Sequence, residues 1–233
     1  MAVISMASPK GGVGKTTSAL VLAGELAQAG STVTLIDADP NEPLTMWEQI
    51  RGPREGITIR NRIDEENIID EIEAARAESK MVIVDLEGTA GVLVTYAITR
   101  SDLVLVPLQG SQLDAVQATR AVRLIRQNEK ALERDIPYAL VFTRTSAAIQ
   151  GRTFKHVAAE LETARVDICP TQLIEREAFR ALFSLGGTLH DLRDADVSNL
   201  DMAKENAEQF AFDVLQRLPK KTKSRARKAG RAA

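Results

Sequence analysis

A short segment near the N-terminus, "SPKGGVGKTT" at residues 8–17, combines the residue types that bind phosphate groups. Its glycines allow backbone N–H groups to turn inward around phosphate oxygens. Lys15 is placed to contact the β- and γ-phosphates of a nucleotide, and Thr16 to offer its hydroxyl to Mg²⁺. We expect the nucleotide-binding residues to be Gly11, Gly12, Val13, Gly14, Lys15, Thr16 and Thr17.

The same segment carries a second lysine that the ordinary phosphate-loop pattern does not require. The pattern G-x-x-x-x-G-K-[ST] has glycine at its first position, whereas this chain has Pro9 there, followed by Lys10. The side chain of Lys10 could fold onto its own nucleotide, point to solvent, or reach into a second subunit. The residues by themselves leave these three options open.

Three carboxylates follow apolar strands and are candidates for magnesium and water chemistry. Asp37 and Asp39 in "TLIDADP" are two residues apart, so both can face the same side of a strand end. Asp85 ends the apolar run "MVIVDL", the form of a Walker B element, and is expected to hold Mg²⁺ through water. A structural alternative for Asp39 is a helix N-cap or an Asx-turn before Pro40.

The elements that position these residues alternate along the chain. Near-continuous β-branched runs indicate strands buried on both faces, at residues 2–8, 32–37, 80–86, 102–108 and 138–143. Helices are expected between and after them, at residues 15–29, 42–51, 65–78, 111–133, 152–164 and about 200–218. This alternation predicts an α/β fold, a doubly wound and mostly parallel sheet flanked by helices.

The loop "KGGVGKTT" resembles the deviant Walker A motif of the ParA/MinD family of P-loop ATPases. The resemblance implies that Lys10 is the signature lysine, which reaches across an ATP-bound homodimer to the partner's phosphates. It also implies that Asp39 of the family's "D-x-D-P" segment orients the attacking water and that Asp37 supports the Mg²⁺ shell. Lys10, Lys15 and Asp39 are therefore the expected catalytic residues, with Thr16, Asp37 and Asp85 at the metal.

The resemblance extends over residues 2–215, through segments that are weak individually. "VFTRT" and "CPTQLIEREAFRALFSLGGTL" resemble the strand end and the adenine-side segment of small partition ATPases. "DLEGTAG" departs from the family's Asp-x-Pro-Pro, and its Glu87 is expected to be exposed. Ser111 and Asp114 are expected to form a capping box for the helix at 111–133.

Composition excludes several classes of protein. No apolar run approaches the length of a membrane span and no signal peptide is recognisable, so we expect a cytoplasmic protein that does not bind membranes. Cys169 is the only cysteine, which excludes an intrachain disulfide or a thiolate metal cluster and favours a buried, structural role.

Charge is distributed unevenly. Residues 219–233 form a basic tail with seven Lys or Arg, which leaves 23 basic against 32 acidic residues in the ATPase domain expected at 1–218. Such a tail favours a polyanionic partner or merely a solubilising role.

Within the family, these features favour a small plasmid-partition ATPase. It would bind DNA non-specifically as an ATP dimer, associate with the nucleoid, and be stimulated by a centromere-bound, ParB-like partner. The expected DNA-binding residues are Arg193, Lys204, Arg217, Lys220, Lys221, Lys223, Arg225, Arg227, Lys228 and Arg231. Two alternatives are a positioning ATPase for conjugation, T-DNA transfer or another protein cargo, and a metabolic P-loop ligase of the dethiobiotin-synthetase type.

Overall fold

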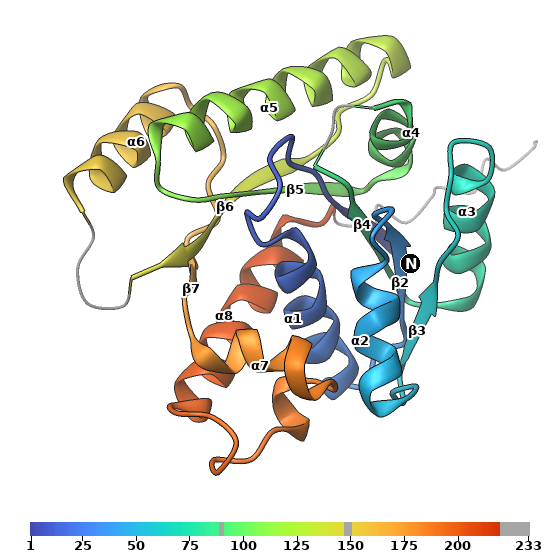
Figure 1. Ribbon diagram of the computed structural model, residues 1–233. Coiled ribbons are helices and arrows are strands. Elements are labelled where there is room, and N and C mark those ends of the chain that lie inside the picture. Colours follow the sequence, from blue (N-terminus) through green and yellow to red (C-terminus); the bar gives the residue numbers. More distant parts are fainter. Residues whose placement is uncertain (89–90, 147–150, 220–233) are drawn as a thin grey trace, which may run out of the picture.

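The computed structural model describes residues 1–88, 91–146 and 151–219. Its centre is a seven-stranded sheet with the order β3-β2-β4-β1-β5-β6-β7, in which every neighbouring pair is parallel (Figure 1). The strands are β1 (Ala2–Met6), β2 (Val33–Ala38), β3 (Ile57–Arg60), β4 (Met81–Leu86), β5 (Leu103–Leu108), β6 (Tyr138–Thr145) and β7 (Leu173–Ile174). The predicted parallel α/β class is confirmed.

Helices cover both faces of the sheet and enclose two separate cores. One face carries α1 (Lys15–Gln28), α2 (Pro43–Arg51), α7 (Glu177–Leu185), the 3₁₀ turn η1 (Leu189–Asp191) and α8 (Leu200–Arg217). The other carries α3 (Ile68–Glu78), α4 (Val92–Arg100), α5 (Gln112–Leu132) and α6 (Arg152–Thr163). Between two parallel strands the chain must return to the edge of the sheet from which the first strand started. The crossover helices that make this connection pack on one face or the other, so both faces are covered.

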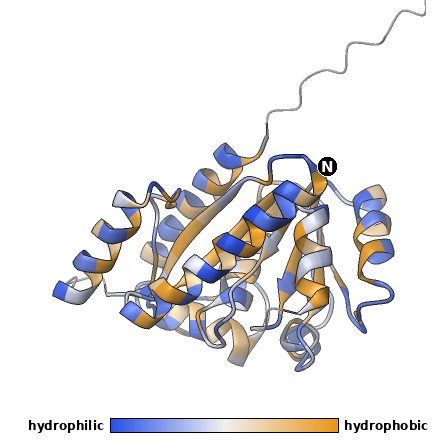
Figure 2. Ribbon diagram, turned by 90° about the horizontal axis from the view of Figure 1, so that it is seen from above, coloured by the Kyte–Doolittle hydropathy of each residue, from blue (hydrophilic) through white to orange (hydrophobic). Residues whose placement is uncertain are grey.

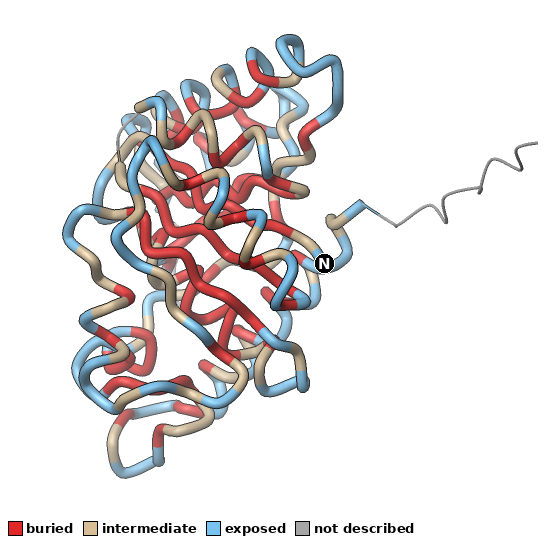
Figure 3. Tube along the Cα trace, turned by 90° about the vertical axis from the view of Figure 1, so that its right-hand side faces the viewer, coloured by how far each residue is buried: buried red, intermediate tan, exposed pale blue. Residues whose placement is uncertain are grey.

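The central strands are buried along their whole length, as their apolar runs predict (Figure 3). Alternate residues of β4 serve different cores: Ile83 packs with α1 and α8, while Val82 and Val84 pack with the helices opposite. A strand with two apolar faces cannot show an alternating pattern, which explains why the strands were recognisable as continuous runs.

Strands β3 and β7, helices α4 and α7 and the 3₁₀ turn η1 were not predicted. Strands β3 and β7 lie at the edges of the sheet and are only four and two residues long. Helix α4 reads "VLVTYAITR", whose β-branched residues resemble a strand. Helix α7 did have a readable signal, since its buried residues follow helical spacing and Gly186 ends it.

The helices carry both hydrophobic and hydrophilic residues, which Figure 2 shows as orange and blue segments along their ribbons. On the last helix, α8, Ala207, Phe210, Ala211 and Val214 are buried, whereas Leu215 is 40% exposed. Cys169 is buried as expected, and burial raises the pKa of its thiol to about 11, consistent with an inert packing residue. No helix in the described part of the chain combines the length and apolarity needed to cross a membrane.

The packing of α8 predicts contrasting effects for two phenylalanines. Phe210 is fully buried and Phe212 is 55% exposed on the same helix. Phe210→Ala should lower the free energy of unfolding by about 3–5 kcal/mol, because it removes a large side chain from a closely packed core. Phe212→Ala should change it by less than about 0.5 kcal/mol. Urea denaturation of both variants tests this, and equal losses would contradict the burial described for this helix.

Candidate nucleotide-binding site

The phosphate loop connects the end of β1 to the start of α1 and turns around an open cavity. Gly12 and Gly14 have φ angles of 72° and 89°, the left-handed region that side chains other than glycine rarely adopt. Helix α1 begins directly after Gly14, so its positive N-terminus points at the cavity. The cavity has a volume of about 480 Å³, and its lining includes Gly11, Gly12, Gly14, Lys15, Thr16, Thr17 and Asp39.

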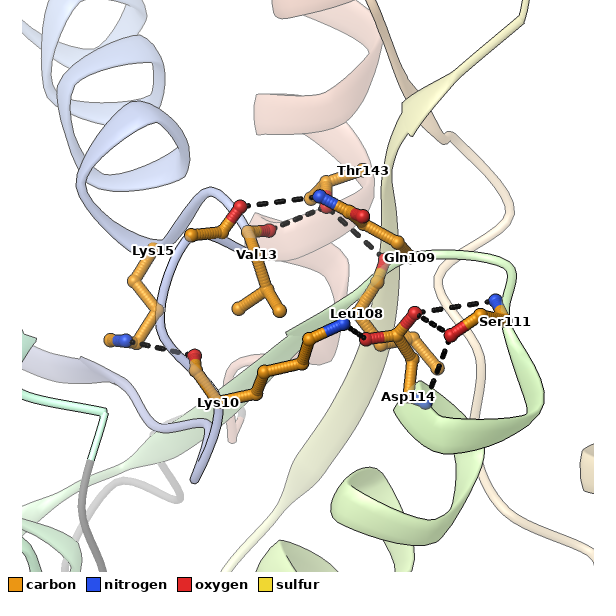
Figure 4. A network of polar contacts seen from close by, with 9 residues as sticks. Lys10, Val13, Lys15, Leu108, Gln109, Ser111, Asp114 and Thr143 are labelled. Carbon is orange, nitrogen blue, oxygen red and sulfur yellow. Dashed lines mark hydrogen bonds and ion pairs between the residues drawn. The ribbon is translucent and has the colours of Figure 1, made fainter.

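Thr143, near the end of β6, anchors the phosphate loop to the sheet (Figure 4). Its buried hydroxyl lies 2.6 Å from the carbonyl oxygen of Val13 and 3.1 Å from that of Leu108. The Gln109 amide donates to the carbonyl of Gly12 at 3.2 Å. Thr143 belongs to the "VFTRT" segment, which resembles a strand end of small partition ATPases, and the resemblance assigns no role to this hydroxyl. It fixes the loop to the sheet.

Lys15 lies at the base of the cavity and is 7% exposed. Its ammonium donates a hydrogen bond of 3.4 Å to the carbonyl of Lys10, on the same loop. Burial lowers the pKa of Lys15, although Asp85, Asp39 and Glu87 act in the opposite direction by attraction. The amine is thus partly desolvated and surrounded by acids, an environment that suits a cation meant to contact phosphate.

Asp85 is the penultimate residue of β4, where the parallel register places it next to Asp37 of β2. Its side chain is fully buried, and neither carboxylate oxygen makes a hydrogen bond within the described residues. Burial raises the pKa of Asp85 to about 7. An unpartnered buried carboxylate of this kind fits a site that hydrated Mg²⁺ would complete, together with the Thr16 hydroxyl and nucleotide oxygens.

The two carboxylates of "DADP" differ in their contacts. One oxygen of Asp37 accepts hydrogen bonds from the backbone N–H groups of Leu44 and Thr45, both at 2.9 Å, and so caps α2. The other is buried without a partner among the described residues, and burial raises the pKa of Asp37. Asp39 accepts from the Asn41 backbone at 2.9 Å, an Asx-turn. Of the two structural alternatives for Asp39, the turn is therefore found, whereas Asp37 supplies the helix cap.

Lys10 does not point to solvent in this structure. Its ammonium lies 2.6 Å from a carboxylate oxygen of Asp114, whose side chain is 2% exposed (Figure 4). Asp114 also completes the predicted capping box with Ser111 at the start of α5. Burial alone would raise the pKa of Asp114, but the hydrogen bonds from Lys10 and Ser111 lower it. The carboxylate therefore stays ionised and holds Lys10 within its own chain.

The segment after β4 lies closer to the phosphate loop than the sequence indicated. Glu87 is half-buried and lines the cavity, so the expectation that it is exposed was wrong. A Cβ on Gly88 would lie 2.9 Å from the Gly11 nitrogen, which explains why glycine occurs where the family has proline. The two loops are in van der Waals contact, and any side chain at position 88 would separate them.

A second, mostly apolar pocket continues from Gly14 and Thr17. Leu173, Phe179 and Phe183, from β7 and α7, form its apolar wall. Arg144 borders both this pocket and the phosphate cavity and has a left-handed backbone, with φ of 50°. Sequence reasoning placed "CPTQLIEREAFRALF" on the adenine side without naming contacts. The amphipathic spacing of α7 was the signal that could have identified them.

The predicted DNA-binding residues are not gathered into one free basic surface in the described chain. Arg193 pairs with Asp196 at 2.9 Å, and Arg217 pairs with Asp167 at 2.9 Å. Lys204 borders a groove that also contains Glu25 and Glu208. The remaining members of the set, Lys220, Lys221, Lys223, Arg225, Arg227, Lys228 and Arg231, lie outside the described residues.

Comparisons with known proteins agree with this geometry. The family model described as "VirC1 protein" matches residues 1–226. A ParA protein of Rhizobium radiobacter is 40% identical over 218 residues, which cover 94% of this chain and 98% of that protein. The virC1 protein of the same organism is 27% identical over 191 residues, covering 80% of this chain and 82% of that protein.

Solved structures show the same fold. A putative plasmid partition protein from Borrelia burgdorferi B31, crystallised with AMPPNP, superposes with a TM-score of 0.69 at 18% sequence identity. The match covers 93% of this chain and 99% of that one. At this level of identity the likeness concerns the fold.

The anchor on the phosphate loop leads to a matched pair of substitutions. Thr143→Val leaves the carbonyls of Val13 and Leu108 without this donor and should lower stability by about 1–3 kcal/mol. It should also weaken binding of an ATP analogue several-fold, because the loop loses its attachment to β6. Thr145 is two residues away and its buried hydroxyl has no partner in the described chain, so Thr145→Val should be nearly neutral. Thermal unfolding and calorimetric titration distinguish the two, and equal effects would contradict the anchoring role.

Asp85 generates a pH-dependent prediction for the nucleotide-free protein. Its folded pKa of about 7 lies above the ordinary value of 3.8, so the folded state holds this proton more tightly than the unfolded state. The destabilisation due to the ionised carboxylate grows as pH rises from about 4 to about 7 and is constant above that range.

Asp85→Asn should therefore raise the melting temperature at about pH 8 and leave it nearly unchanged at about pH 4. The same variant should lose the Mg²⁺ dependence of nucleotide binding. Asp194→Asn, which removes the same charge from an exposed position, is the control. A gain in melting temperature that is independent of pH would show that Asp85 is not buried in its charged form.

Proposed function

The chain belongs to the ParA/MinD family of P-loop ATPases and matches its VirC1 proteins, and from this premise we propose an ATP-driven DNA-partition ATPase. Nucleotide hydrolysis is implied by the family's P-loop fold. ATP binding would close a homodimer, and the dimer would bind DNA non-specifically on the nucleoid. A centromere-bound, ParB-like partner would stimulate hydrolysis and release.

The observation that carries this proposal is the contact between Lys10 and Asp114. A lysine held at 2.6 Å by a buried carboxylate of its own chain cannot at the same time reach a partner's nucleotide. Lys10 can therefore contact either Asp114 of its own chain or the partner's nucleotide, but not both. A nucleotide-dependent dimerisation switch requires two such mutually exclusive arrangements. The capping box keeps Asp114 in place whichever arrangement Lys10 adopts.

Within each subunit, different residues would have different roles in hydrolysis. Lys15 and the N-terminus of α1 would bind the phosphates, and Lys10 of the partner would add positive charge as the transition state forms. Asp39 borders the cavity and would orient the attacking water, while Asp37 supports the start of α2. Mg²⁺, held by Thr16 and through water by Asp85, would neutralise phosphate charge.

The apolar pocket formed by Leu173, Phe179 and Phe183 is the proposed site for the nucleotide base. It adjoins the phosphate loop at Gly14 and Thr17, so one nucleotide could occupy both cavities. Apolar walls suit a planar base, and Arg144 at the junction of the cavities is placed to contact the ribose or phosphates.

The match to the VirC1 proteins over residues 1–226 supports a second candidate, a positioning ATPase for DNA transfer or another protein cargo. Gel shifts with and without ATP distinguish the two functions. A partition ATPase should retard any duplex DNA only with ATP. A cargo-positioning ATPase should show no ATP-dependent shift, and turnover that depends on an added small acid or amine would instead indicate a metabolic ligase.

Three substitutions test the mechanism by separating nucleotide binding from dimerisation. Lys15→Ala should abolish nucleotide binding, since it removes the cation in the cavity. Lys10→Ala should leave monomer binding largely intact but prevent the ATP-bound dimer. Asp114→Asn should allow the dimer to form at lower protein concentration, because it removes the charge that holds Lys10 while its amide oxygen can still accept the capping hydrogen bond.

Light scattering coupled to gel filtration measures the oligomeric state in each case, with ATP and with ADP. A dimer that forms equally well in Lys10→Ala would overturn the assignment of Lys10 to the partner's site. An Asp114→Asn protein that dimerises less readily than the parent would show that the Lys10–Asp114 contact supports the dimer instead of competing with it.

A further inference from the structure

A groove between α5 and α6, separate from the nucleotide site, has the features of a binding surface. Its volume is about 430 Å³. Helix α5 forms one wall, and the end of α6 with the following residues forms the other. The two helices are neighbours on the same face of the sheet (Figure 1). Leu140 of β6 lies at its floor. None of the residues predicted for nucleotide, metal or DNA lines it.

The two walls of this groove differ in chemistry. Val122, Leu140, Leu161 and Val166 give it an apolar floor and far side. Its α5 side carries three exposed cations, Arg123, Arg126 and Lys130. They are spaced by three and four residues, so they lie along one side of the helix over about 10 Å.

These cations lack the acidic partners that other arginines of the chain possess. Arg60, Arg76, Arg193 and Arg217 each form an ion pair with an Asp or Glu. No ion pair involves Arg123, Arg126 or Lys130 among the described residues, and the described side-chain contact of this set is from Arg126 to the Tyr138 hydroxyl at 3.2 Å.

We propose that this groove binds an acidic amphipathic helix of a partner protein. The apolar floor would take the partner's hydrophobic residues, and the row of cations would face Asp or Glu side chains along one edge of that helix. A purely apolar partner would leave the cations without acidic contacts, and a purely acidic partner would leave the apolar floor without hydrophobic contacts.

Other occupants fit less well. A DNA backbone presents phosphate charges and deoxyribose rings but no apolar side chains to fill a cavity of this size, and the α6 side contributes Leu161 and Ala164, with no cation. The chain's own tail, residues 219–233, is strongly basic and would be repelled by the α5 side. An acidic peptide is the occupant favoured by both charge and apolarity.

The test selects binders from a random peptide library displayed on phage, using the full-length protein as bait. Enriched peptides should combine Asp or Glu with apolar residues at helical spacing, and should bind more weakly as salt is raised. Arg123→Glu should weaken the selected peptides by about tenfold, as should Lys130→Glu. Arg120→Glu is the matched control, because Arg120 is exposed on the same helix but does not line the groove.

A third variant, Thr119→Trp, tests the groove without altering charge, because Thr119 is an exposed residue of its lining. It should also weaken peptide binding, while nucleotide affinity and melting temperature report that each variant is folded. Enrichment of basic or uncharged peptides would overturn the proposal, as would equal binding to the Arg123→Glu and Arg120→Glu proteins. Loss of duplex DNA binding in Arg123→Glu but not in Arg120→Glu, with no acidic peptide enriched, would assign the surface to nucleic acid instead.

Discussion

The wholly parallel sheet is the constraint on which the nucleotide site depends. Parallel strands end at one edge, and the observed register places Asp37 of β2 directly beside Asp85 of β4. β1 lies between β4 and β5, so the phosphate loop that follows β1 starts beside the end of β4 that carries Asp85. Ligand sites of doubly wound proteins form at this edge because the connections there diverge to opposite faces of the sheet.

Burial of charged groups at this edge lowers the stability of the nucleotide-free protein, and a bound ligand would remove this unfavourable free energy. Asp85 has no hydrogen bond from the described residues, and burial raises its pKa to about 7. Lys15 is partly desolvated close by, and its pKa is lowered. Perturbed groups of opposite charge in one cavity are typical of functional sites. The nucleotide-free protein is therefore expected to be less stable than the nucleotide-bound protein, because Mg²⁺ would offset the buried charge of Asp85 and the phosphates that of Lys15.

Helix α5 links two surfaces for which different functions are proposed. Its first turn contains Asp114, which holds Lys10, and its later turns form one side of the groove between α5 and α6. Its N-terminus is fixed by the capping box with Ser111. The N-terminus of α5 is therefore fixed at the nucleotide site, and its later turns carry exposed cations away from that site. The proposed functions of the two surfaces are independent and can be tested separately.

Sequence by itself determined the features whose physical cause is local. The glycines of the phosphate loop, the apolar runs of the central strands and the capping box of α5 follow from backbone freedom, burial on two faces and hydrogen bonding within one turn. Tertiary structure decided the contacts between residues far apart in the chain. Lys10 meets Asp114 and Thr143 meets Val13 only because β1, β5 and β6 are neighbours in the sheet. No spacing along the chain encodes that adjacency, because it depends on the order in which the strands pair.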